Sequence, residues 1–414
     1  MSKIKEIYAR EIKDSRNNPT IEVELKTEKS SFTASCPSGV STGKNEALEL
    51  RDADGRGISK AIENVNKILA PKLKNKDPVS QKELDDIMIE LDGTYNKSKL
   101  GANAILPVSM VICRAGASAE KLPLYLYISK LTGSSLNIPF PSFNILEGGA
   151  HAKNDLDIQE FMIVPEKKSF SENLVLVNKI FQNLQEIITK NYPARIATQN
   201  VAGGGKEIEM GDEGGFAPKI SKTEQALFLL KNAIDNNSDV KIAIDCAASQ
   251  FYKEGKYILE KKEFSRINLI DFYKDLATRF PIISIEDPFS EDDWQGFEEI
   301  IKEMPNITII GDDLTTTNVK RIKLAHSKNA CNGVIIKQNQ IGTVTETIDA
   351  AKLVKSFGWK TVVSHRSGET MDDFIADLAV GIGADFIKSG SPSQAERMVK
   401  YNRLLEIENE LSKI

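Results

Sequence analysis

The sequence has few residues of the two types that most often bind transition metals in proteins. Its 414 residues include four cysteines and three histidines. The cysteines, Cys36, Cys113, Cys246 and Cys331, are widely separated and form no CxxC pair. This pattern favours buried or half-buried thiols in a reducing cytoplasm, and three histidines argue against a multi-histidine metal site.

Signals for nucleic acid, export and membrane insertion are also missing. The net charge is -5 and no basic block carries interleaved aromatic residues, which argues against nucleic-acid binding. The first ten residues, MSKIKEIYAR, contain no apolar signal-peptide core. The most apolar stretch, residues 102–119, is interrupted by Asn103, Pro107 and Arg114, so we expect a buried helix and no membrane span.

Two glycine-lysine segments resemble phosphate-binding loops but do not match the Walker A motif. "GVSTGKN" has three residues between its glycines where a Walker A motif has four, and Asn45 follows Lys44 where Ser or Thr is needed. "GGGKE" fails at the same place, and no GxGxxG follows a predicted strand. The sequence therefore gives no support for a nucleotide site.

The chain is long enough for two domains. In the first third, Ile21, Val23 and Leu25 alternate with charged residues as in a half-buried strand, and helical spacing follows at residues 58–69 and 84–91. Gly, Ser and Pro cluster in residues 131–141, a linker composition. We predict an α+β domain over 1–133, with a mobile Ser/Gly loop, and a second domain over 138–414.

In the second domain, short apolar runs recur and each ends in a polar residue. The six ends are Asp245, Glu286, Asp312, Lys337, His365 and Lys388. Helical patterns lie between several of them, one capped by Thr343 and another by a Thr370–Asp373 capping box. This alternation predicts a (β/α) barrel whose strand ends carry the active site. A doubly wound sheet is the alternative, but it would place functional residues at one switch point.

Three of the strand ends are carboxylates. Brought together at one barrel mouth, Asp245, Glu286 and Asp312 would repel one another unless a cation lay between them. An all-oxygen set suits a hard divalent ion, Mg²⁺ or else Mn²⁺. Each acid alone would be read as a solvated carboxylate or helix cap, so the prediction depends on all three.

The basic strand ends suggest a reaction. Lys337 and Lys388 face the same mouth, and a second ammonium together with a divalent metal would favour a neutral lysine that acts as a base. Arg366 offers a bidentate fork for phosphate or carboxylate. Isolated residues of these types are usually snorkelling lysines or surface ion pairs, but here they share the strand-end position. The set suits removal of a proton α to a carboxylate, with an opposing carboxylic acid protonating a departing hydroxyl.

Two further segments carry candidate residues. In "GDEGGFAP", residues 211–218, glycines would allow the backbone to aim a carboxylate inward, although a plain turn explains the same letters. "HAKNDLDIQEFMIV" places His151, Gln159 and Glu160 just before another apolar strand. A lone histidine is more often structural, so this second segment is weaker support.

Together these motifs resemble the enolase family. The similarity runs from about residue 4 to about 410, and the motifs that carry it are "SRNNPTIEVEL", "PSGVSTG", "LGANAIL", "DIQEFMI", "GDEGGFAP", "SIEDP", "GDDL", "NQIGT", "SHRSGET" and "KSGSPSQAERMVKYN". The resemblance implies an α/β fold, a modified (β/α)8 TIM-type barrel after a smaller α+β domain. It implies reversible dehydration of 2-phosphoglycerate to phosphoenolpyruvate with two Mg²⁺ ions, in a cytoplasmic homodimer or higher homo-oligomer.

The resemblance also implies roles for single residues. Lys337 would remove the C2 proton and Glu213 would be the acid that assists loss of the C3 hydroxyl, with Glu160 and His365 on the catalytic side. The metal ligands that it implies are Asp245, Glu286, Asp312 and Ser41. The substrate contacts that it implies are His151, Gln159, Arg366, Ser367 and Lys388.

Some positions depart from the usual family pattern. Asn17 replaces a common Gly in a turn that Asn also tolerates, and Val40, Gln250 and Gln394 replace a usual Ala, a frequent Glu and a frequent Arg. None of these is a residue assigned to the chemistry. Two rivals remain, a sister lyase or racemase of the superfamily and a catalytically retired binding protein on the same fold. The sister lyase or racemase should lack Glu213 and "SHRSG". The retired binding protein should have lost some of the polar residues at the strand ends.

Overall fold

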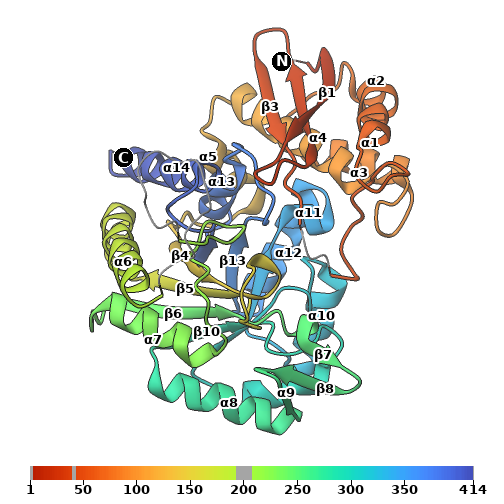
Figure 1. The fold of residues 1–414 in the computed structure, drawn as a ribbon. Coiled ribbons are helices and arrows are strands. Elements are labelled where there is room, and N and C mark those ends of the chain that lie inside the picture. Colours follow the sequence, from red (N-terminus) through yellow and green to blue (C-terminus); the bar gives the residue numbers. More distant parts are fainter. Residues whose placement is uncertain (1–2, 40–42, 193–207, 414) are drawn as a thin grey trace, which may run out of the picture.

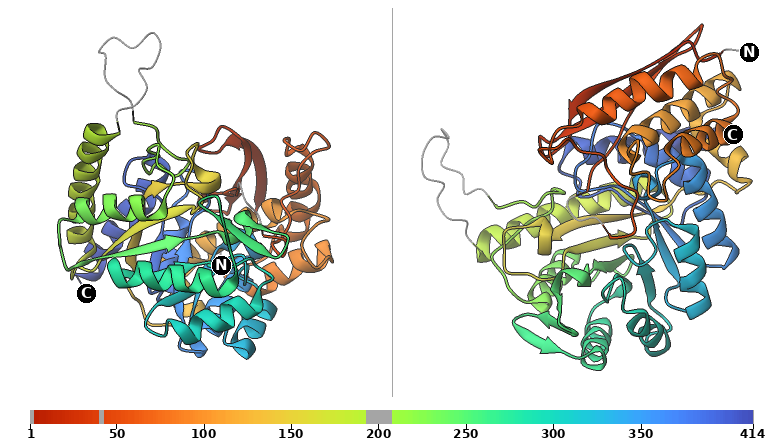
Figure 2. Two further views of the ribbon diagram at one scale, coloured as in Figure 1. Left: turned by 60° about the horizontal axis from the view of Figure 1, so that its bottom comes forward. Right: turned by 90° about the vertical axis from the view of Figure 1, so that its right-hand side faces the viewer.

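The computed structural model describes residues 3–39, 43–192 and 208–413. Its first part is an antiparallel sheet of order β1-β2-β3 backed by helices (Figure 1). The elements of this part are β1 (Glu6–Lys13), β2 (Pro19–Lys26), β3 (Ser31–Ser35), α1 (Ser59–Asn64), a π-helical turn (Val65–Leu69), α2 (Ala70–Leu73), α3 (Gln81–Asp92), α4 (Ala102–Ala119) and α5 (Leu124–Thr132). The sheet and helices lie at one end of the molecule, against the second part (Figure 2).

The core of this first part follows from its sequence pattern. Ile21, Val23 and Leu25 are fully buried, as their alternation in β2 predicts. Asn17 turns the chain between β1 and β2 with φ at 62°, in the left-handed region that asparagine tolerates, so the expected turn is confirmed.

Helix α4 packs against β2 and β3. Within the described residues it is the one helix whose length and hydropathy would allow it to cross a membrane, and 83% of that window is buried inside the protein. Burial of this kind is what the sequence predicts for a core helix. All four cysteines are buried free thiols, also as expected.

The second part is a closed barrel of eight strands, which confirms the barrel and rules out the doubly wound sheet. Its strands in spatial order are β10 (Ile282–Glu286), β11 (Thr308–Gly311), β12 (Gly333–Ile336), β13 (Lys360–Ser364), β14 (Phe386–Lys388), β4 (Phe140–Glu147), β5 (Glu160–Pro165) and β6 (Val240–Asp245). Strand β5 runs antiparallel to both of its neighbours, whereas the other pairs are parallel. The barrel is therefore a modified one.

Helices surround the barrel (Figures 1 and 2), and a small hairpin sheet lies beside it. The helices are α6 (Phe170–Asn191), α7 (Thr223–Ile234), α8 (Arg266–Arg279), α9 (Trp294–Glu303), α10 (Val319–Lys328), α11 (Gln338–Ile341), α12 (Val344–Ser356), α13 (Phe374–Gly381) and α14 (Ala395–Leu411). Short 3₁₀ turns span Gly149–His151 and Ala248–Phe251, and the hairpin sheet comprises β7 (Tyr252–Lys253), β8 (Lys256–Leu259) and β9 (Lys262–Phe264).

One helix start is confirmed and one is wrong. Thr343 caps α12 by accepting the N–H of Glu346. The predicted Thr370–Asp373 capping box does not form, because α13 begins only at Phe374. The carboxylate of Asp372 accepts the N–H of Phe374 at 2.9 Å, while Asp373 pairs with the guanidinium of Arg114 at 2.8 Å. Asp373 is thus held by α4, a contact that could not be read from the local sequence.

Candidate active site

All six predicted strand ends lie at the carboxyl end of the barrel. Three of them close their strands, and the other three follow the last strand residue directly. A cavity opens there, and its lining residues are Gly39, Glu46, His151, Gln159, Glu160, Glu213, Asp245, Ala247, Asp287, Asp312, Asp313, Lys337, His365, Arg366, Ser367 and Lys388. Of the predicted site residues, Glu286 lies deeper and lines the space inside the barrel with Lys388. Ser41 lies outside the described residues.

Lys388 binds three carboxylates at the floor of the cavity. Its Nζ lies 3.1 Å from Asp245, 3.0 Å from Glu286 and 2.9 Å from Glu160. Burial disfavours the ammonium, but these carboxylates raise the pKa of Lys388 well above its usual range. Three neighbouring strands, β5, β6 and β10, thus present their terminal acids to one cation.

Lys337 forms an ion pair with Asp312, whose other oxygen accepts a hydrogen bond from Gln340 at 2.8 Å. Burial opposes the charged lysine, yet Asp312 raises the pKa of Lys337, and Lys337 in turn lowers the pKa of Asp312 against its own burial. Against Asp312 alone the amine therefore keeps its proton. The neutral lysine expected from the sequence depends on a cation at these carboxylates and stays a prediction. Arg366 and Lys388 act in the expected direction, but more weakly.

The cavity holds an excess of buried acid. Burial, reinforced by Asp245, raises the pKa of Glu286 well above its usual range. Asp287, a residue with no predicted role, accepts the N–H of Asp312 at 3.0 Å and the N–H of Asp313 at 2.7 Å. Among the described residues, two groups bring metal-ligand atoms within 4.8 Å of one another: Asp287, Asp312 and Asp313, and His151, Glu160 and Glu213.

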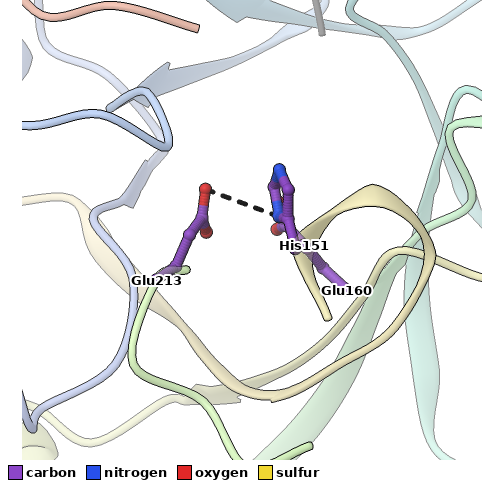
Figure 3. A group of neighbouring side chains, drawn as sticks. All are labelled: His151, Glu160 and Glu213. Carbon is purple, nitrogen blue, oxygen red and sulfur yellow. Dashed lines mark ion pairs between the residues drawn. The ribbon is translucent and has the colours of Figure 1, made fainter. Parts of the chain in front are cut away.

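The second group forms the wall of the cavity opposite β12, since Glu160 begins β5, four strands away around the barrel. In this group His151 and the carboxylate of Glu213 point toward one another (Figure 3). His151 Nδ1 lies 3.7 Å from Glu213 and 3.5 Å from Glu160. Burial, then the charge of Glu213, raise the pKa of Glu160 to about 8. Burial also opposes ionisation of Glu213, but His365 and His151 lower its pKa well below the usual range. Within this acid pair, Glu160 therefore holds the proton at neutral pH.

His365 has a defined tautomer. Its Nδ1 lies 2.7 Å from Nη1 of Arg397, which can only donate, so the ring proton of the neutral form is on Nε2. Nε2 lies 3.1 Å from Glu213. Burial lowers the pKa of His365 to about 4, which keeps the imidazole neutral at neutral pH. Arg397, also missed from the sequence, thus orients the histidine toward the acid.

From the lowered pKa of His365 we expect the free energy of unfolding to depend on pH. Between its ordinary pKa of 6.5 and its folded value of about 4, the unfolded chain binds a proton that the folded chain does not. Its contribution is therefore lost as the pH falls through this window, by about 3 kcal/mol in total. Denaturant unfolding of the wild type and His365→Gln between pH 7 and 4 checks this. The free energy of unfolding should fall less steeply with decreasing pH in His365→Gln than in the wild type. Equal slopes in the two proteins would contradict the assignment.

Arg366 lies beneath the loop that precedes residue 40. Its guanidinium pairs with Glu46 at 2.7 Å, a partner that the sequence did not suggest. A Cβ built on Gly39 would lie 1.9 Å from Nη2 of Arg366, so only glycine allows the loop to pass this closely. Paired backbone hydrogen bonds between Ser38 and Gly368, at 2.8 and 2.9 Å, fix the loop beside "SHRSG".

Gln159 is held by Gln250, the residue that stands where the family often has Glu. The side-chain amide of Gln250 donates to Gln159 Oε1 at 2.5 Å and accepts the N–H of Ala150 at 3.2 Å. Gln159 itself approaches Asp245 at 3.5 Å. The replacement at position 250 thus leaves a hydrogen-bonded link between Gln159 and the 149–151 turn.

Another buried acid was missed at the end of β4. Glu147 accepts backbone hydrogen bonds from the "GDEGG" segment, and burial, reinforced by the charge of Glu213, raises its pKa well above the usual range. Its position after an apolar strand was visible in the sequence, but the segment that it contacts is 64 or more residues away, so no local pattern links them.

Comparison with known proteins gives matches to both parts of the chain. The family model "Enolase, N-terminal domain" matches residues 4–128, and "Enolase, C-terminal TIM barrel domain" matches residues 135–414. Among curated proteins, "Enolase 1" of Entamoeba histolytica is 48% identical over 433 aligned positions, which cover 99% of this chain and 97% of that protein.

Proposed function

The chain belongs to the enolase family, and from this membership we infer that the barrel mouth carries out the reversible dehydration of 2-phospho-D-glycerate to phosphoenolpyruvate. The enzyme is a hydro-lyase of glycolysis and gluconeogenesis. The observation that carries the inference is the division of the cavity into two walls, with Lys337 on one and the Glu160–Glu213 pair on the other. A dehydration of this kind needs a base and an acid on separate sides of its substrate.

The family uses divalent metal, and we propose two Mg²⁺ ions per site, replaceable by Mn²⁺. Asp245, Glu286 and Asp312 would hold the first, since they offer only oxygen and lie at the ends of three adjacent strands. The raised pKa of Glu286 fits a site with more negative charge than its lysines balance. Ser41 would contribute to the second. When bound, the ions would stabilise the negative charge that develops on the substrate carboxylate.

Lys337 is the proposed base. Its Nζ reaches the cavity from the end of β12, and Asp312 is the group that raises its pKa. A cation bound to Asp312 would remove that effect and leave Arg366 and Lys388, which lower the pKa of Lys337. The free amine can then accept the C2 proton.

The Glu160–Glu213 pair is the proposed acid. Glu160 holds a proton at neutral pH, and the two side chains share contact with His151. We assign delivery of the proton to Glu213 and its supply to Glu160, with Nε2 of His365 lying 3.1 Å from the Glu213 carboxylate. A substrate anion beside the pair would raise both pKa values and favour the protonated form of Glu213.

The remaining polar residues of the cavity would bind the substrate. Arg366 and Ser367 suit its phosphate, while Lys388, Gln159 and His151 suit its carboxylate and hydroxyl oxygens. A racemase-type relative would not need the acid wall or the "SHRSG" segment, and both line this cavity. From the family we further propose a cytoplasmic homodimer or larger homo-oligomer.

The activity is tested directly with 2-phosphoglycerate and Mg²⁺. We expect ultraviolet absorbance of the enol phosphate to appear, to vanish when a chelator removes the metal, and to return with added Mg²⁺ or Mn²⁺. Absence of the signal with both ions would contradict the proposal. Activity that survives complete chelation would contradict the metal requirement.

A further inference from the structure

Glu147 is a fully buried carboxyl group at the end of β4 that the proposed chemistry does not use. Its two oxygens face the backbone of the Gly211–Gly215 turn. One accepts the N–H of Glu213 at 3.2 Å, and the other accepts the N–H of Gly215 at 2.5 Å. The side chain therefore binds the backbone of the proposed acid itself.

The glycines of this turn are matched to the Glu147 side chain. A Cβ on Gly211 would lie 2.1 Å from Oε2 of Glu147, and one on Gly215 would lie 2.8 Å from Oε1. Contacts below 3.0 Å would force the backbone or the carboxyl group to move. The two glycines thus provide the space in which the carboxyl group reaches the turn.

Strand β4 holds the turn from a second direction. The N–H of Glu147 donates to the carbonyl oxygen of Phe216 at 2.9 Å. The N–H of Phe216 donates to the carbonyl oxygen of Ile145 at 3.0 Å. In the adjacent ladder Glu147 lies opposite Glu160. The residue therefore connects the turn that carries Glu213 to the strand pair that carries Glu160.

We propose that Glu147 is a positioning residue that holds the Gly211–Gly215 turn, so that the Glu213 carboxyl group reaches the leaving hydroxyl. This inference rests on the proposed function and assigns a role to a residue outside the reacting set. Lys337 follows β12, which is three strands from β4 around the barrel. Loss of Glu147 should therefore affect proton delivery and spare proton removal.

The test compares two rates in the full-length protein: dehydration of 2-phosphoglycerate and exchange of its C2 proton with solvent. Glu147→Gln keeps the volume but presents an NH₂ group to one of the two N–H donors. We expect kcat for dehydration to fall roughly 10-fold, and about 100-fold in Glu147→Leu, because small misplacements of a reacting group are costly. KM and C2 exchange should stay within about twofold of wild type.

Asp85→Asn is the matched control. Asp85 is a fully buried carboxylate that also accepts a backbone N–H, from Thr345 at 3.0 Å, but it lies on α3 and contacts α12. Its substitution should lower stability and leave the ratio of exchange to dehydration unchanged. If Glu147→Leu does not fold, Glu147→Gln decides the question.

Two outcomes would overturn the inference: unchanged dehydration in Glu147→Gln, or exchange and dehydration that fall together in the Glu147 variants. Glu213→Gln, measured in parallel, separates the two proposals. If Glu213→Gln dehydrates normally, the acid assignment is wrong. If it loses dehydration while Glu147→Gln keeps it, only the role of Glu147 is wrong.

Discussion

Lys337→Ala is expected to abolish exchange of the C2 proton and to lower kcat for dehydration by roughly 10²–10⁴-fold, the range typical of a lost general base. The reason is geometric, since Lys337 is the amine at the end of β12 and its Nζ reaches the cavity. Both rates should fall together because proton removal precedes loss of the hydroxyl. Solvent-isotope exchange and ultraviolet absorbance measure the two.

Lys97→Ala is the matched control for this prediction. Lys97 is likewise a buried lysine in an ion pair, 2.9 Å from Glu346, but it does not line the cavity. Its loss should reduce stability and leave both rates near those of the wild type. Exchange that persists in Lys337→Ala at the wild-type rate would show that another group removes the proton, and Lys388 would be the next candidate.

Glu213→Gln is expected to have the opposite pattern, with dehydration reduced by roughly 10²–10⁴-fold and C2 exchange retained. Glutamine has nearly the same shape and keeps an acceptor for Nδ2 of Asn144, which donates to Glu213 at 3.0 Å. It cannot supply a proton to the departing hydroxyl. The absorbance of the enol phosphate measures the loss.

Asp377→Asn controls for removal of a buried carboxylate. Asp377 pairs with Arg403 at 2.9 Å, away from the cavity lining. Its substitution should not separate exchange from dehydration. Loss of both rates in Glu213→Gln would count against separate acid and base walls, because the base wall is intact in that variant.

The barrel and the identity of its strand ends could be predicted because the information is local. A β-branched run such as residues 334–336 that meets Lys337 states both where a strand is and where it stops. Repetition of that pattern then identifies the common mouth, since the parallel strands of a barrel all end at one face.

What could not be predicted depends on partners from distant segments. Three contacts join residues 32 or more positions apart, and none has a local signal: Glu46 with Arg366, Arg397 with His365, and Glu147 with the Gly211–Gly215 turn. The ion pair of Lys337 with Asp312 could not be predicted for the same reason, because it depends on how close the two side chains lie. Residue types at strand ends indicate a chemistry, but only tertiary packing fixes the protonation states.

The most direct test is the ratio of C2 exchange to dehydration, measured in D₂O for the wild type, Lys337→Ala and Glu213→Gln in one series. The account predicts no exchange in Lys337→Ala, and exchange without matching dehydration in Glu213→Gln. If both variants lose the two rates in proportion, the division of the barrel mouth into a base wall and an acid wall is wrong.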